Sequence, residues 1–174
     1  MIGQKSALLL ENRHPLLVGL AAGLVAGAVA GRSDKLFDRL VSKEHKRRER
    51  KVRKGSPHQL AGPHFAEKIL GRKLDEEQKK RARLAFSVVY GVGWGLIHGT
   101  LRQRFPKLSR WGGLPFAVPF FFACDGFIAP GLGLSPNLRR IPWQPSLKEM
   151  GNHVVWTAAA ELVHRLAART GGGR

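Results

Sequence analysis

The stretch PLLVGLAAGLVAGAVAG, residues 15–31, decides the fold because a glycine returns at every fourth position within it. Residues four apart lie on the same face of a helix, so these glycines predict a helix with one face free of side chains. In water each glycine costs a helix about 1 kcal/mol relative to alanine, whereas in lipid such a face lets a second helix pack closely. The pattern therefore favours a membrane helix over the alternative, a soluble, alanine-rich core helix. The glycines of this first stripe are Gly19, Gly23, Gly27 and Gly31.

A second apolar segment, LAFSVVYGVGWGLIHGTL at residues 84–101, repeats the pattern with Gly91, Gly95 and Gly99. Two such stripes in consecutive segments predict glycine-zipper packing, in which the bare backbones of two helices touch. The simplest arrangement is an antiparallel pair within one chain. The alternative is that the first stripe packs against a second copy, which would make the protein a homo-oligomer.

Two further apolar segments raise the expected number of spans to about four. Residues 114–134 contain Pro115, Pro119 and Pro130, which predict a kinked helix that a membrane bundle tolerates. Residues 150–168 are apolar on one side only, so this segment either spans the membrane or lies in the interface. We therefore expect an all-α integral membrane bundle that forms a single domain over residues 1–174. The expected spans are residues 15–31, 84–101, 114–134 and 150–168.

The charge of the chain is concentrated between the first two spans. Of its 30 Lys and Arg and 12 Asp and Glu, 18 and 8 respectively lie in residues 32–83. Basic residues next to a membrane helix mark the cytoplasmic side, so residues 32–83 are expected to be a basic cytoplasmic loop, with both chain termini outside. Anionic lipid head groups are the partners that such a loop attracts. Within it, residues 43–54 predict a solvated helix, and Asp75 predicts the N-cap of a helix that continues into the second span.

The remaining sequence disfavours several other classes of protein. The basic segment has almost no aromatic residues to stack on bases and no zinc-finger or RNA-recognition signature, which disfavours nucleic-acid binding. Ala28, Val29 and Ala30 resemble a signal-peptidase site, but the acidic Glu11 before it and the basic residues after it argue against cleavage. The single Cys124 excludes an internal disulfide. Because no phosphate-binding glycine loop, nucleophile elbow or metal-binding spacing occurs, we expect no enzymatic activity, no cofactor and no metal.

Features of the C-terminal half resemble a known family. Asp125 lies five residues before Pro130 in the pattern PGLGLSP, HVVW begins the last helix at His153, and Glu161 follows that histidine eight residues later. Residues 66–101 are similar to the helix-then-span element of related bacterial membrane proteins. Together these motifs resemble the YagU-like family of small uncharacterised bacterial inner-membrane proteins, over about residues 15–31 and 57–167. The resemblance implies a helical protein of the inner membrane, with no enzymatic activity to carry over and a loose association with acid tolerance.

Four ionisable residues inside the expected spans are the candidate functional residues: His98, Asp125, His153 and Glu161. An aspartate or a basic residue at the centre of a membrane helix costs about 2.5–3.5 kcal/mol, and such residues usually face the bundle interior. The expected topology places His153 near the inner side, Asp125 and Glu161 near mid-depth, and His98 toward the outside. One interpretation is a proton or ion path. The favoured interpretation is a set of interhelical hydrogen bonds that fix the packing.

Three functions follow from these observations. The leading one is a non-enzymatic inner-membrane protein that acts through helix packing or oligomerisation. The first alternative is a proton- or ion-conducting protein that uses Asp125, His153 and Glu161. The second alternative is a membrane-tethered basic domain that binds nucleic acid through residues 32–83.

Overall fold

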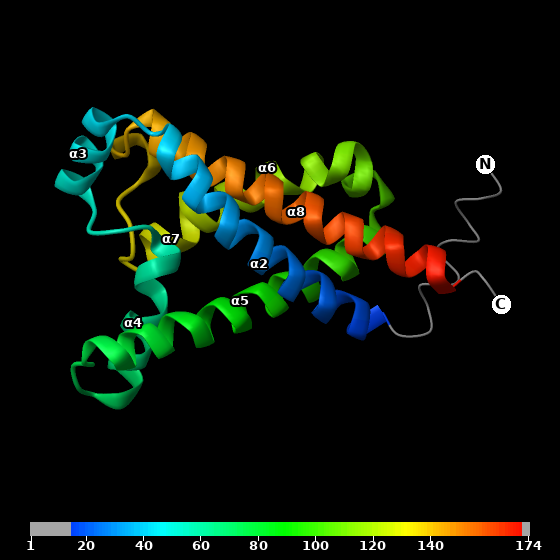
Figure 1. The fold of residues 1–174 in the computed structure, drawn as a ribbon, viewed down its shortest axis with the longest axis horizontal. Coiled ribbons are helices and arrows are strands. Elements are labelled where there is room, and N and C mark those ends of the chain that lie inside the picture. Colours follow the sequence, from blue (N-terminus) through cyan, green and yellow to red (C-terminus); the bar gives the residue numbers. More distant parts are fainter. Residues whose placement is uncertain (1–14, 172–174) are drawn as a thin grey trace.

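The computed structural model describes residues 15–171, in which four helical passes run along the length of the molecule (Figure 1). These residues contain no strand, which confirms the all-α fold. The start of α2 and the end of α8 lie at one end of the molecule, whereas α3 and α4 lie at the other, here called the basic end (Figure 1). Residues 1–14 and 172–174 of the expected domain, including Glu11, lie outside the described residues. The passes are α2 (Pro15–Leu40), α5 (Glu76–Arg104), α6 to α7 (Leu114–Gly131) and α8 (Trp143–Gly171).

The expected basic loop, residues 32–83, is mostly helical. The first helix, α2, continues past the apolar stretch to Leu40. The Ser42 hydroxyl then accepts from the N–H of His45 at 3.3 Å and caps a new helix. A third helix has Pro57 in its first turn and ends at Gly71, whose φ of 65° lies in the left-handed region that favours glycine. The two new helices are α3 (Lys43–Val52) and α4 (Pro57–Leu70).

The N-cap expected at Asp75 is present at the start of α5. The Asp75 carboxylate accepts from the N–H of Gln78 at 2.8 Å, and the Gln78 side chain accepts from the N–H of Asp75 at 3.3 Å. This reciprocal capping box satisfies two backbone donors that a helix start would otherwise leave unpaired. The helix α5 therefore begins eight residues before the second apolar segment and continues through that segment without a break.

Prolines and a π-helical turn divide the third pass. Pro119 lies inside α6, and Pro130 has no N–H with which to continue an α-helical ladder. Between them the N–H of Ala129 donates to the carbonyl of Cys124, five residues back, which is the wide spacing of a π-helix. Asp125 lies in this turn. The segments are α6 (Leu114–Phe121), the π-helical turn (Phe122–Ile128) and α7 (Ala129–Gly131).

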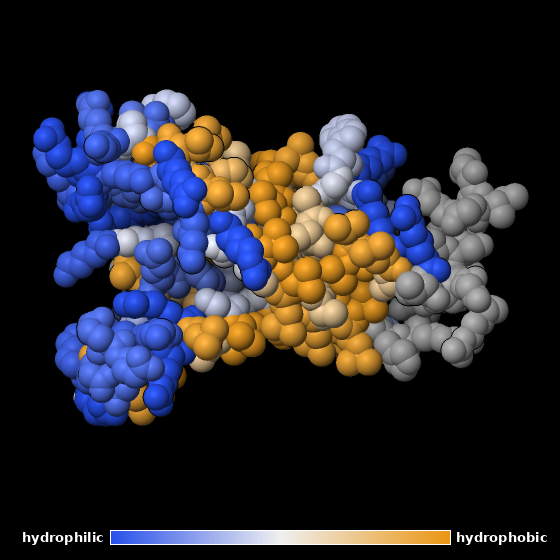
Figure 2. Space-filling model, in the orientation of Figure 1, coloured by the Kyte–Doolittle hydropathy of each residue, from blue (hydrophilic) through white to orange (hydrophobic). Residues whose placement is uncertain are grey.

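A wide apolar surface surrounds a small core. Ala22, Ala160, Phe120 and Trp156 are buried in the core, whereas large apolar side chains on α2 and α5 are exposed, among them Val89 at 71%. Figure 2 shows a continuous apolar band over the middle of one face, bordered by hydrophilic residues at the basic end. Among the described residues, the helices long and apolar enough to cross a membrane are Pro15–Leu40, Glu76–Arg104 and Pro106–Gly131. Since α8 is not one of these, the fourth span stays a prediction.

The helices α2 and α5 cross with backbone against backbone. A Cβ added to Gly23 would overlap the carbonyl group of Gly91, and one added to Gly95 would overlap the backbone of Gly19 and Gly23. The partner of this part of the first stripe is thus α5 of the same chain, which runs in the opposite direction along α2 (Figure 1).

The other glycines of the two stripes have different surroundings. A Cβ added to Gly27 or Gly31 would meet no heavy atom within 4 Å. One added to Gly99 would lie 3.3 Å from the imidazole of His164 on α8. The first stripe therefore packs against α5 in its first half and faces open space in its second half.

Candidate functional site: two polar clusters and a cavity

A buried cluster of ionisable side chains joins α5 to α8. The Glu161 carboxylate, only 1% exposed, lies 3.1 Å from Nε2 of His98 and accepts from Nε of Arg102 at 3.3 Å. Arg165, one turn further along α8, approaches the same carboxylate at 3.9 Å. Moving a charge out of water costs several kcal/mol unless close partners compensate it. This Glu161 cluster (His98, Arg102 and Glu161) is therefore a cross-link whose parts depend on one another.

A second pair, Asp125 and His153, joins the π-helical turn to α8. Nδ1 of His153 lies 2.9 Å from the carbonyl oxygen of Glu149. Because a carbonyl only accepts, that nitrogen carries a proton. Nε2 faces Oδ2 of Asp125 at 3.5 Å, which is longer than an ordinary hydrogen bond. The imidazole of His153 and the carboxyl group of Asp125 are therefore close neighbours that link the π-helical turn to α8.

Aromatic rings separate these two polar sites. The ring of His98 meets Phe116 at 4.7 Å between centroids, Phe116 meets Phe120 at 5.4 Å, and Phe120 meets His153 at 4.5 Å. Trp156 lies against Phe120 at 5.3 Å and belongs to the same buried apolar cluster. A chain of water molecules needs polar partners along its length, which these rings do not offer. The structure thus groups the four candidate residues as two pairs rather than as one path.

Ion pairs at the basic end attach α2 and α3 to the start of α8. The Arg53 guanidinium donates to Glu149 at 3.2 Å, and Nζ of Lys148 lies 3.2 Å from Asp34. Asp34 also accepts from the side-chain amide of Asn152 at 2.8 Å. Burial raises the pKa of Glu149 to about 7, while the neighbouring Lys148 and Arg53 oppose that shift. These contacts hold α2 and the end of α3 against the first turns of α8.

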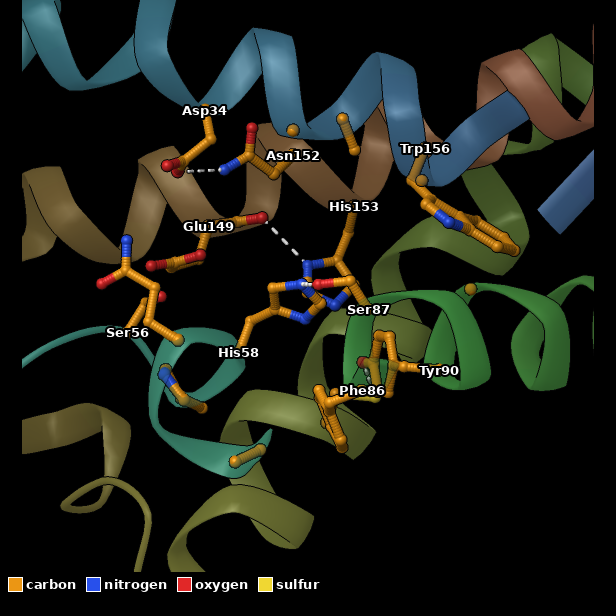
Figure 3. Close-up of a pocket in the computed structure, with 18 of the residues that line it drawn as sticks. Asp34, Ser56, His58, Phe86, Ser87, Tyr90, Glu149, Asn152, His153 and Trp156 are labelled. Atoms are coloured by element: carbon orange, nitrogen blue, oxygen red, sulfur yellow. Dashed lines mark hydrogen bonds between the residues drawn. The ribbon is translucent and has the colours of Figure 1, made fainter. Parts of the chain in front are cut away.

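A cavity of about 520 Å³ opens between α2, α4, α5 and α8 beside the Asp125–His153 pair (Figure 3). In Figure 3 the side chains of His58 and Ser87 lie next to His153, and Nε2 of His58 is 2.9 Å from the Ser87 hydroxyl. The Tyr90 hydroxyl donates to the sulfur of Cys124 at 3.1 Å. The rest of the lining is mostly apolar. Ligand sites in proteins have volumes of about 300–1,000 Å³ and this kind of mixed lining.

Several residues of these sites were not among the sequence-based candidates. Arg102 lies one helical turn after His98, so the spacing of the two residues could have indicated a shared helix face. Lys148 and Glu149 precede the expected fourth span, and the helix α8 begins before them at Trp143. The contact of His58 with Ser87 joins residues 29 apart, which no local pattern predicts. Within residues 15–171, no three His, Cys, Asp or Glu side chains are grouped as ligands for a metal ion.

Comparison with known proteins agrees with a membrane location. The chain is 29% identical over 82 residues to the inner membrane protein YagU of Escherichia coli strain K12. The match covers 47% of this chain and 38% of the E. coli protein. No protein-family model and no solved structure matches the chain. The match supports the resemblance to the YagU-like family, and the three membrane-capable helices agree with a multi-pass protein of the inner membrane.

Proposed function

We propose that the chain is a non-enzymatic, four-pass protein of the inner membrane that acts through the packing of its helices. The observation that carries this proposal is the contact between α2 and α5, where Gly23 and Gly95 leave no room for a side chain. Close van der Waals packing of this kind drives helix association in lipid. The Glu161 cluster supplies a second link, from α5 to α8. Both features support a glycine zipper and a packing role for the buried polar residues.

The proposal assigns the basic end to the cytoplasmic surface. Exposed Lys and Arg side chains of α3 then face anionic lipid head groups, to which each contributes about 1 kcal/mol near the surface. A homo-oligomer would form through lipid-facing sides of the helices, because Gly19 and Gly23 already face α5 within the chain. Nucleic-acid binding by residues 32–83 and a link to acid tolerance stay predictions.

The four-span topology predicts which positions a membrane-impermeant reagent can reach. In a Cys124→Ser background, Lys51→Cys on α3 should react with an impermeant maleimide only after the inner membrane is opened. Lys107→Cys and Arg169→Cys should react in intact spheroplasts, because the proposal places the turn after α5 and the end of α8 outside. All three positions are exposed. Mass spectrometry of the purified protein measures the labelled fraction.

Arg169 decides whether α8 spans the membrane. If Arg169→Cys, like Lys51→Cys, reacts only after the inner membrane is opened, α8 does not cross the membrane and the four-span proposal is wrong. If Lys51→Cys reacts in intact spheroplasts, the orientation is inverted. Full labelling of each variant in denaturing detergent is the control that every thiol is intact.

One observation favours a second candidate function, proton or ion conduction. The Asp125–His153 pair consists of two ionisable groups and lies beside the cavity, as a proton-relay site would. The rings of Phe116 and Phe120 stand between this pair and Glu161. The packing function is therefore better supported than a path through all three residues.

Proton flux into proteoliposomes should separate these two functions. We expect liposomes with the wild-type protein to dissipate an imposed pH gradient no faster than empty liposomes, as read by an enclosed pH-sensitive dye. Asp125→Asn and Glu161→Gln should leave that rate unchanged, because apolar rings separate the two sites. Addition of a protonophore verifies that each gradient was intact. A wild-type flux that either substitution abolishes would establish conduction and overturn the packing function.

A further inference from the structure

The cavity between α2 and α5 has no role in the packing proposed above. Its α2 side includes Gly27 and Gly31, where an added Cβ would meet no heavy atom within 4 Å. The two helices touch at Gly23 and Gly91 and then separate toward the basic end, where α4 brings His58 into the wall. Glycine at these open positions keeps a volume free that larger side chains would fill.

The described wall of the cavity carries acidic rather than basic side chains, although the chain as a whole is basic. Among the described lining residues there is no Lys or Arg, although the chain has a net charge of +18. Two of the lining carboxylates pair with cationic side chains outside the wall. Asp125, 7% exposed, faces His153 and is the carboxylate that a positively charged ligand can approach from the cavity. The lining carboxylates are Asp34, Asp125 and Glu149.

Aromatic rings surround the same space. Phe86 and Tyr90 stack with centroids 5.4 Å apart, and Figure 3 shows both with Trp156 around the cavity. The face of an aromatic ring attracts a cation, and rings combined with a carboxylate are what proteins use to hold organic ammonium groups. The aromatic lining residues are Phe65, Phe86, Tyr90, Phe120 and Trp156.

The rim of the cavity is apolar and faces outward. Leu84 and Val88 of α5 line it and are 68% and 45% exposed, and Leu24 of α2 lines it at 48%. These residues belong to helices that are apolar enough to cross a membrane. A ligand with an apolar body can therefore enter sideways from the lipid, whereas an anion would meet carboxylates and a small polar solute would find apolar walls.

From these observations we infer that the cavity is a binding site for a lipophilic organic cation. The positive charge lies at Asp125, and the apolar body lies among the aromatic rings between α2 and α5. This inference goes beyond the packing function and does not depend on it.

Binding of two ions of equal shape and opposite charge tests the inference. The full chain, purified in nonionic detergent and immobilised on scintillation beads, is titrated with radiolabelled tetraphenylphosphonium and separately with tetraphenylborate. We expect saturable binding of the cation and at least tenfold weaker binding of the anion. Equal binding of both ions, or saturable binding of neither, would overturn the inference, the first outcome indicating a site for any apolar body.

Two variants with matched controls locate the bound cation. Gly27→Phe fills the cavity from a position with open space and should abolish binding, whereas Gly93→Phe, at an equally open glycine outside the cavity, should not. Asp125→Asn keeps the shape of the side chain and should weaken binding at least tenfold, whereas Glu44→Gln on the exposed surface of α3 should not.

The thermal unfolding midpoint of each variant shows that it remains folded. Unchanged binding in Gly27→Phe would overturn the location of the site, and unchanged binding in Asp125→Asn would overturn the role of its charge. If Asp125→Asn fails to fold, two other comparisons still test the inference. One compares the cation with the anion, and the other compares Gly27→Phe with Gly93→Phe.

Discussion

Replacing Gly95 with leucine should lower the thermal midpoint Tm by roughly 6–12 °C or more, because about 1 kcal/mol corresponds to 2–4 °C in a protein of this size. A Cβ at this position would overlap the backbone of both Gly19 and Gly23. Overpacking costs about 1–3 kcal/mol when side chains can adjust, and occasionally more. Backbone atoms cannot rotate away, so the cost falls at the top of that range. The two helices must separate to admit the new side chain, and they lose contacts along their length.

Matched substitutions on α2 separate this effect from a general change in helix composition. Gly27→Leu adds the same side chain where a Cβ meets no atom within 4 Å, and it should leave Tm nearly unchanged or raise it. Leu20→Ala, which shortens a partly buried side chain on the same helix, should cost far less than Gly95→Leu. Unfolding of the full chain in detergent, followed by circular dichroism, provides the measurement. If Gly95→Leu and Gly27→Leu lower Tm equally, α2 does not pack on α5 through Gly95.

The glycine stripes show what local sequence can predict about this fold. A spacing of four residues places Gly19, Gly23, Gly27 and Gly31 on one helix face, and it predicts a close neighbour for all of them. The structure provides that neighbour only for the first two. Two helices that cross at an angle touch over a short length and then diverge. The crossing point and angle depend on every other helix in the bundle. The spacing of the glycines therefore could not predict that a cavity lies beside Gly27.

For the candidate polar residues too, the sequence predicts one property, burial, but not which residues meet. Their presence within apolar segments predicts burial, and His98, Asp125 and Glu161 are each less than 10% exposed. Which residues meet is a different question, because it depends on how each helix is rotated about its axis. The π-helical turn rotates Asp125 relative to a regular helix. Local periodicity therefore identified the buried groups but not their separation by the Phe116 and Phe120 rings.

The Glu161 cluster leads to the other large expected effect. Glu161→Gln keeps the size of the side chain and removes its charge, which leaves Arg102 and the fully buried His98 without their carboxylate. Breaking a buried ion pair by removing one partner costs about 3–5 kcal/mol. The variant should therefore unfold roughly 6–20 °C below the wild type. Glu44→Gln removes an exposed carboxylate from its pair with Arg48 and should cost less than about 1 kcal/mol.

A double-variant cycle shows whether that cost arises from the ion pair itself. Once Arg102 has been replaced by glutamine, the Glu161 carboxylate has already lost its guanidinium partner on α5. The double variant should then be more stable than the sum of the two single effects predicts, by about 0.5–3 kcal/mol. Strict additivity would mean that the two side chains do not interact. In that case α5 and α8 would pack without this cross-link. The packing function would then be supported by the glycine contact between α2 and α5 alone.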